Sequence, residues 1–358
     1  MPEYLEPYQD YKYLYLSDVK RFLEGQMLYK DFHSAYPPLW MYTLAAAVKI
    51  NPSYWGAAVP LVIFDALTAP LTYLIACRLV DVRWSTIIGV VTALAPAALW
   101  YNSILWLNPP PSTFFLLLTT YFLLAKRMKL SATSFALATL YKQTVLAALP
   151  VMVIGVYRLS SRRSVVWFIV IFAALLLLIS MPYLALFPSI YLWALGFPGL
   201  PTPPPYMPED LTVWEYNIVK PTNLGSVFGV FGAPWVAIFF RQSLIYVISA
   251  ALIIFTLLFI GIKVLDGETI IRYLLYSQLL FILLFPRGTY KYFYTTTLPF
   301  FALGCRKKGD ILTFAAINIG VLLIPRFFEP WFAIVIMLFA HAVARENASI
   351  PRSDKVNV

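Results

Sequence analysis

The sequence predicts an all-α, polytopic membrane protein with about eleven transmembrane helices. Of its 358 residues, 61% are hydrophobic and only 12% are charged, and the mean hydropathy is +0.75. Soluble domains carry about 25% charged residues, so this composition excludes a soluble enzyme, a disordered chain and a coiled coil. With only two cysteines and two histidines, a disulfide scaffold and a cysteine-based or histidine-rich metal site are also excluded.

Apolar runs recur along most of the chain. A helix needs roughly 17–25 residues to cross the hydrocarbon core of a bilayer. The runs lack the alternation of apolar and polar residues that marks barrel strands, so helices are favoured over a β-barrel. The expected spans are residues 56–79, 84–101, 112–126, 130–141, 144–158, 165–188, 243–263, 268–286, 290–305, 309–325 and 328–344.

Basic residues lie between alternate spans, and by the positive-inside rule these turns are cytoplasmic. They account for most of the formal net charge of +10 without a nucleic-acid partner. The basic residues are Arg78, Arg83, Lys126, Arg127, Lys129, Arg158, Arg162, Arg163, Arg306, Lys307, Lys308, Arg345, Arg352 and Lys355. The external face then carries residues 1–34, 102–111, 141–144, 190–242, 286–291 and 326–329.

The whole chain, 1–358, reads as a single integral membrane domain. Because no apolar run precedes the acidic N-terminal segment, we expect neither a signal peptide nor a leading span. Residues 36–50 either lie along the outer interface or cross the bilayer, and we favour the interface. The expected parts are an external loop with interfacial helices at 1–55, a first helix bundle at 56–189, an external loop rich in proline and aromatic residues at 190–242, a second helix bundle at 243–345 and a cytoplasmic tail at 346–358.

The N-terminal segment holds the residues best suited to chemistry outside the spans. Carboxylates there can act as bases, and the aromatic rings can serve as platforms for a sugar or a lipid. The alternative is a solvated amphipathic segment whose tyrosines lie at the membrane interface. The segment contains Asp10-Tyr11-Lys12-Tyr13, Ser17-Asp18, Gly25, Tyr29, Asp31 and Tyr36-Pro37-Pro38-Leu39.

This pattern resembles the first external loop of the GT-C glycosyltransferases, which are multi-span enzymes that use polyprenyl-phosphate sugars. It is most similar to the catalytic subunit of the GPI mannosyltransferase and to related prokaryotic proteins. In that loop two aspartates one residue apart precede a tyrosine; here Asp10 matches the first and Lys12 replaces the second. The resemblance implies a GT-C-like bundle with its site in the external loops, Asp10 as the main catalytic base and Asp18 as the second. The expected substrate-binding residues in this segment are Tyr13, Tyr29, Asp31 and Tyr36.

Cations on the external face are the expected binding site for the donor phosphate. Arg287 can hold phosphate oxygens through two parallel hydrogen bonds, and Lys291 and Lys142 can act as point charges. Tyr290 lies between the first two and is expected to bind substrate. The alternative for these cations is snorkelling to the interface or pairing with lipid headgroups.

The resemblance implies an inverting transfer with a carboxylate base. A hexose, with mannose suggested by the family, would move from a polyprenyl- or dolichyl-phosphate donor to a lipid-linked or glycan acceptor on the outer face of a prokaryotic plasma membrane. No cofactor is expected. We favour metal-independent chemistry, because Lys12 stands in place of a second acid and residues 102–111 contain none. A divalent metal remains the alternative.

Two other function classes stay open. One is a non-catalytic membrane assembly subunit, and the other is a lipid or solute transporter. A transporter is disfavoured because the chain shows no matching halves and its ionisable residues gather at one face. Asp65 lies within a predicted span, and we expect it to form hydrogen bonds with a neighbouring helix.

Overall fold

The computed structural model describes residues 10–32, 34, 36–195, 266–284, 290–325 and 328–348. This part of the chain is helical and contains no strand, which confirms the predicted all-α class. The expected span at 243–263 and most of the loop at 190–242 lie outside the described residues.

The helices follow one another with short connections. The elements are η2 Asp10–Tyr15, α1 Leu16–Leu23, α2 Pro38–Ile50, α3 Ala58–Ala76, α4 Val82–Ala93, α5 Pro96–Ala98, η3 Leu99–Ile104, α6 Pro109–Leu124, α7 Met128–Tyr141, η4 Gln143–Ala148, α8 Leu149–Leu159, α9 Arg162–Leu186, α10 Pro188–Ala194, α15 Gly267–Leu284, η5 Lys291–Thr296, α16 Leu298–Ala302, α17 Lys308–Leu323 and α18 Glu329–Ala348. Elements η2 and η3 are π-helical, whereas η4 and η5 are 3-10 helices.

Local sequence explains several helix starts. The Asp81 side chain accepts a hydrogen bond from the Trp84 backbone N–H at 3.0 Å and so caps α4. Ser161 accepts one from the Ser164 N–H at 3.2 Å and caps α9 in the same way. Such caps satisfy backbone donors that have no partner within the helix. Helices α2, α6, α8 and α16 instead begin with proline in their first turn, where its missing N–H costs nothing.

Three segments of the described chain are long and apolar enough to cross a membrane: Ala58–Ala76, Val82–Ile104 and Arg162–Leu186. The outer surface of α9 indicates that lipid surrounds this helix. Large apolar side chains such as Leu177 (53% exposed) and Leu178 (69% exposed) face outward. Water would disfavour so large an apolar surface. The chain is therefore a helical membrane protein. The expected total of about eleven spans stays a prediction.

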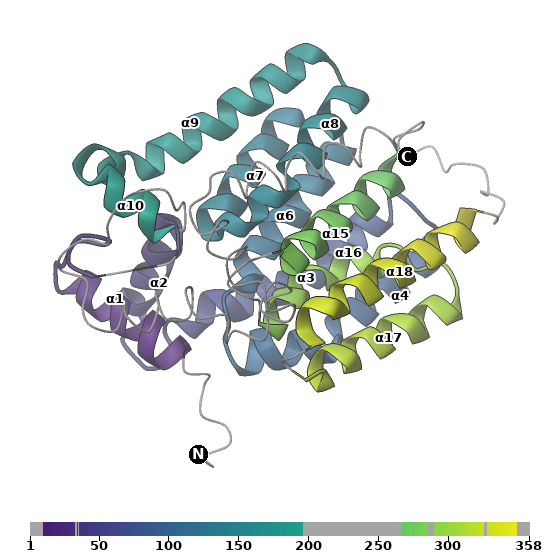
Figure 1. Cartoon of the computed structure of the whole chain (residues 1–358), viewed down its shortest axis with the longest axis horizontal. Coiled ribbons are helices and arrows are strands. Elements are labelled where there is room, and N and C mark those ends of the chain that lie inside the picture. The colour runs from purple at the N-terminus through teal and green to yellow at the C-terminus, as the bar shows by residue number, and fades with distance from the viewer. Residues whose placement is uncertain are drawn as a thin grey trace, which may run out of the picture.

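Helix α7 lies at the centre of the bundle, between α6 and α9 (Figure 1). Most of its residues are buried, and many of them are small: Ser131, Ala132, Ser134, Ala136, Ala138 and Thr139. Small side chains let neighbouring helix backbones approach closely, which is the main source of packing energy between helices in an apolar medium. This packing fixes the position of Tyr141 and Lys142 at the end of α7.

The expected span at 290–305 is not a single helix. Residues 290–305 form the 3-10 helix η5, followed by the short helix α16. Pro299 lies in the first turn of α16, and a proline there cannot donate a hydrogen bond to continue the preceding helix. The break leaves η5 as a separate turn among the neighbouring helices.

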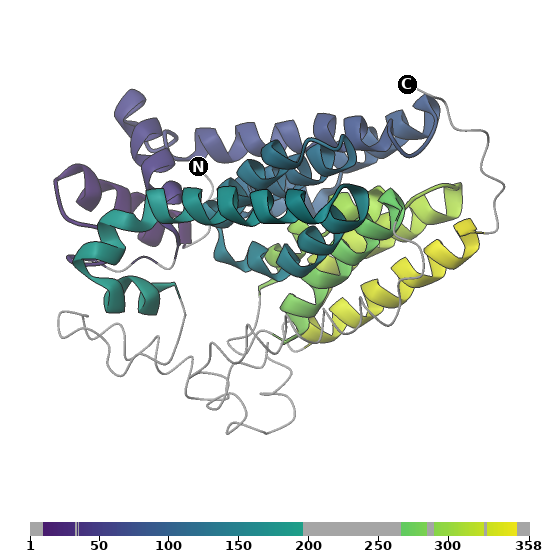
Figure 2. The ribbon, with the colours of Figure 1, turned by 90° about the horizontal axis from the view of Figure 1, so that it is seen from above.

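The basic turns contact one another at one end of the bundle. Arg78, after α3, donates to the Tyr121 hydroxyl at 3.2 Å near the end of α6. Arg306 pairs with Glu268 at 3.2 Å, and Lys307 pairs with Glu346. In Figure 2 the turn between α3 and α4, the start of α9 and the end of α18 lie toward the same side, at the right. The grouping agrees with the expectation that these turns share one face of the membrane.

We expect Gln26 and Ser161 to lie on opposite sides of the membrane. Both are exposed, and of the two native cysteines only Cys77 is exposed. In a Cys77→Ser background, a membrane-impermeant maleimide should label Gln26→Cys in intact cells but label Ser161→Cys only after permeabilisation. Labelling of both positions from the same side would overturn the topology.

We expect Phe135→Ala to destabilise the protein by about 3–5 kcal/mol, because it removes a fully buried ring. The ring of Phe135 lies 5.1 Å from Phe172 and 6.0 Å from Phe168, centroid to centroid. Phe339→Ala is the matched control, since that ring is 47% exposed. Denaturant unfolding in detergent should show a much smaller loss for the control, and equal losses would contradict the central position of α7.

Candidate functional site

The predicted external segments contact one another at the other end of the bundle. The rings of Tyr11 and Trp106 lie 4.8 Å apart, which joins the N-terminal segment to the loop before α6. The Gln143 side chain donates to the Leu195 carbonyl at 3.2 Å, which joins the turn after α7 to the end of α10. Segments far apart in the sequence therefore form one continuous region.

A buried aromatic cluster holds this region together. Two hydroxyl pairs connect its helices: Thr43 with Tyr141 at 2.8 Å, and Tyr42 with Tyr183 at 2.8 Å. Edge-to-face packing of two aromatic rings stabilises the fold by about 0.5–1.5 kcal/mol per pair, in addition to the contribution of the buried apolar area. The cluster includes Tyr11, Tyr15, Val19, Tyr29, Trp40, Trp106, Tyr141, Tyr183 and Tyr191.

Tyr29 is a packing residue in the described structure. It is fully buried, and its hydroxyl donates to the Tyr36 carbonyl at 2.5 Å. Its ring lies edge-on to Tyr183 and Tyr191, 4.9 Å from each. A backbone φ of +68° places it in the left-handed region, so these contacts hold a strained turn. The expected substrate-binding roles of Tyr29 and Tyr36 stay predictions.

Asp31 closes the turn that contains Tyr29. It is exposed, and its carboxylate accepts a hydrogen bond from the Met27 N–H at 2.7 Å. The bond fixes the loop between α1 and α2. The expected contact of Asp31 with substrate stays a prediction.

Asp18 lies on α1 beside the aromatic cluster. Burial raises the pKa of its carboxyl to about 8, and the nearby charge of Arg21 lowers it by less. A general base works best when its pKa lies near the working pH, so this carboxyl is suited to accept a proton from a hydroxyl. Asp10 lies in η2, eight residues earlier, and its side chain and that of Tyr13 lie outside the described residues.

Lys142 is the most unusual cation of the region, because its side chain is only 4% exposed. Its ammonium group donates to the Asn108 side-chain oxygen at 2.8 Å. It also lies 4.1 Å from the ring centre of Phe293 and 5.1 Å from that of Tyr292. Contact with aromatic faces stabilises a cation in an apolar setting. The structure thus joins the turn after α7 to η5, two segments that both carry expected phosphate-binding residues.

Lys291 begins η5 and turns toward α17. Its ammonium group donates to the Leu322 carbonyl at 3.0 Å, in the last turn of α17, where the helix dipole favours a positive charge. Tyr290 is 41% exposed, and its ring stacks on Tyr292 at 5.7 Å. Arg287 lies outside the described residues. Among the expected phosphate-binding cations, Lys291 therefore begins η5, and Lys142 comes from the end of α7 and packs against rings of η5.

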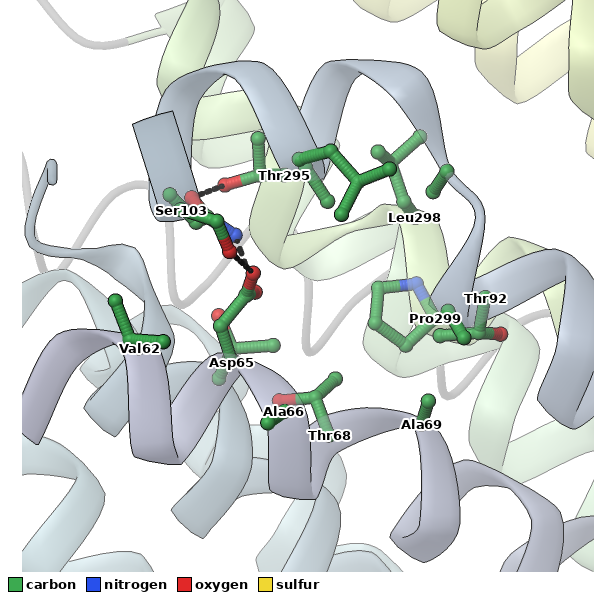
Figure 3. Close-up of a pocket in the computed structure, with 16 residues that line it drawn as sticks. Val62, Asp65, Ala66, Thr68, Ala69, Thr92, Ser103, Thr295, Leu298 and Pro299 are labelled. Atoms are coloured by element: carbon green, nitrogen blue, oxygen red, sulfur yellow. Dashed lines mark hydrogen bonds between the residues drawn. The ribbon is translucent and has the colours of Figure 1, made fainter. Parts of the chain in front are cut away.

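Asp65 forms a second polar site that the sequence analysis left out of the expected site residues. Its two carboxylate oxygens accept hydrogen bonds from the Asn102 amide at 2.8 Å and from the Ser103 hydroxyl at 2.6 Å. The expected hydrogen bonding to a neighbouring helical segment is thus confirmed. The three residues line a cavity of about 180 Å³, whose other walls come from α4, α5, α6, η5 and α16 (Figure 3). The signal in the sequence was an acid in one apolar run and an Asn-Ser pair at the end of the next.

Among the described residues, no group of three or more His, Cys, Asp or Glu side chains could hold a metal ion. Comparison of the chain with protein-family models, curated proteins and solved structures finds no match. The resemblance to the GT-C glycosyltransferases therefore stays a prediction.

We expect the stability of the protein to fall as the pH rises from about 4 to about 8, in part because of Asp18. Its folded pKa of about 8 lies above the ordinary value of 3.8, so the folded state binds this proton more tightly than the unfolded state does. The stabilisation is complete below the ordinary pKa and is lost as the pH approaches 8.

Asp18→Asn should remove this contribution, so the melting temperature in detergent should fall less with pH than in the wild type. Ser17→Ala, a neutral change at the neighbouring position of α1, should keep the wild-type slope. Identical slopes in the wild type and Asp18→Asn would mean that Asp18 is not a buried titrating group.

Proposed function

We propose that this protein is an integral membrane glycosyltransferase of the GT-C type. It transfers a hexose, with mannose as the first candidate, from a polyprenyl-phosphate donor to a lipid-linked or glycan acceptor. The observation that supports this most is that the helix carrying Asp18 and the turn carrying Lys142 adjoin the same aromatic cluster. Val19, which follows Asp18, and Tyr141, which precedes Lys142, belong to the same buried aromatic cluster.

Lys142 is suited to hold the donor phosphate. Its ammonium group is buried and is oriented by Asn108 and by the ring of Phe293. In a medium of low dielectric constant, a fixed cation attracts an anion much more strongly than it does in water. A polyprenyl phosphate brings such an anion to the membrane, and its chain can remain in the lipid.

The residue types match an inverting transfer. An acceptor hydroxyl attacks C1 of the sugar, and a carboxylate, Asp10 or Asp18, accepts the hydroxyl proton. The bond between C1 and the phosphate oxygen breaks, and the polyprenyl phosphate leaves with the electron pair. Lys142, with Lys291 and Arg287 as further expected cations, lowers the barrier by stabilising the charge that develops on the leaving phosphate.

We expect Lys142→Met to weaken donor binding about 10- to 100-fold, the loss typical of a hydrogen bond to a charged group. Turnover should fall about 10²- to 10³-fold, because the same cation stabilises the leaving group. Lys129→Met is the matched control: its ammonium group also lies over an aromatic ring, that of Trp167 at 5.7 Å, but at the cytoplasmic end in the expected topology.

The assay uses the full chain in detergent with a short-chain polyprenyl-phosphate mannose and a lipid extract as the source of acceptor. Donor binding is measured by titration, and turnover is measured as released polyprenyl phosphate. A folded Lys142→Met protein with wild-type binding and turnover would exclude Lys142 from the donor site. Donor binding without turnover in the wild type would favour the non-catalytic subunit.

A further inference from the structure

The cavity beside Asp65 is polar at one end and mainly apolar along the rest of its wall. Asp65, Asn102, Ser103 and Thr295 form the polar end. Figure 3 shows Asp65 projecting from α3 toward Ser103, with Pro299 and Ala69 farther along the cavity. A cavity of about 150 Å³ accepts a benzene-sized molecule, so the 180 Å³ found here has room for a small organic group.

The hydroxyl groups around this cavity already donate their protons in hydrogen bonds to other groups of the protein. Ser103 donates to Asp65 at 2.6 Å, and Thr295 donates to the Tyr292 carbonyl at 2.7 Å. Thr68 and Thr92 donate to carbonyls of their own helices, at 2.9 Å and 2.8 Å. A hydroxyl has one proton but two acceptor lone pairs, and each carboxylate oxygen accepts more than one hydrogen bond. The wall therefore offers mainly acceptors, and a matching ligand must be a donor.

The charge of Asp65 further restricts the ligand. Two neutral donors stabilise the ionised carboxylate, and none of the described Lys, Arg or His residues forms an ion pair with it. A partly buried carboxylate without a cation is costly in a medium of low dielectric constant. A ligand with a positive charge removes this cost, whereas a neutral alcohol contributes only a hydrogen bond.

The position of the cavity favours entry from the lipid side. Val62 of α3 and Leu99 of η3 line it, and each is 40% exposed on the outer apolar surface. An inorganic ion such as Na⁺ would leave the apolar end of the cavity unfilled. A primary ammonium group has three donors for the polar end, and an attached hydrocarbon chain fills the apolar end.

We propose that the cavity beside Asp65 binds the primary ammonium group of an amphiphile, with its apolar chain along the inner walls. The site is distinct from the expected donor-phosphate cations and does not depend on the transferase proposal. Asp65 supplies the counter-charge, and Ser103 and Asn102 hold its carboxylate in place through their hydrogen bonds.

The test compares n-butylammonium chloride with n-butanol, which has the same chain length and no charge. In the full chain in detergent, butylammonium should raise the melting temperature in a saturable manner, and butanol should not. Sodium chloride and choline chloride at equal ionic strength should have no comparable effect. Asp65→Asn should weaken butylammonium binding at least tenfold, while Thr86→Val, at an exposed position of α4 outside the cavity lining, should leave it within about twofold.

A second measurement does not depend on the stability of the Asp65 variant. In a Cys77→Ser background, Val62→Cys places a thiol in the cavity wall, and butylammonium should slow its reaction with a maleimide. Equal protection by butanol or by sodium ions would overturn the proposal, because it would show that the site selects neither an ammonium group nor an organic chain. Absence of protection by butylammonium would overturn it as well.

Discussion

A polar group inside an apolar helix bundle must find its hydrogen-bond partner within the protein, and this constraint governs how α6 and α7 pack. The Thr119 and Thr120 hydroxyls donate to carbonyls one turn earlier on α6, at 2.7 Å and 2.9 Å. Ser131 of α7 donates across to the Thr119 carbonyl at 3.0 Å. Because these groups are satisfied internally, small polar residues can form a close interface at the centre of the molecule.

That interface determines the rest of the site. Once α7 is fixed, Tyr141 enters the aromatic cluster and Lys142 reaches Asn108, beside the N-terminal end of α6. The same logic applies to Asp65, whose partners Asn102 and Ser103 come from a π-helical turn rather than from a regular helix. Irregular backbone at such a turn is common where a side chain must be directed into a functional site.

The helical class and many helix positions could be predicted from the sequence. The length of an apolar run matches the thickness of the hydrocarbon core, and basic residues mark the turns between such runs. The split at Pro299 could not be predicted with the same ease, since proline is also tolerated inside membrane helices. The burial of Tyr29 was not predicted either. Its partners, Tyr183 and Tyr191, lie more than 150 residues away, and only the tertiary fold brings them together.

The candidate site could also be predicted only in part from the sequence. Residue type alone indicated that Lys142 and Lys291 could bind an anion, but not that Lys142 would pack against rings of η5, the helix that Lys291 begins. The sequence analysis placed the N-terminal carboxylates in the candidate site and did not include Asp65. The sequence around an isolated acid in a span does not indicate which residues of other helices lie next to it. The cavity became evident only in the fold, because its lining comes from α3, α4, α5, η3, α6, η5 and α16.

The length of α9 has a mechanical consequence. Its 25 residues extend about 37 Å at 1.5 Å per residue, whereas the hydrocarbon core of a bilayer is about 30 Å thick. The helix must tilt, or its ends must reach the headgroups. Its last turns carry Tyr183, which stacks against Tyr191 of α10 at 5.8 Å. A helix that tilts to match a bilayer of different thickness would therefore move Tyr183, a member of the aromatic cluster that also includes Val19 of α1.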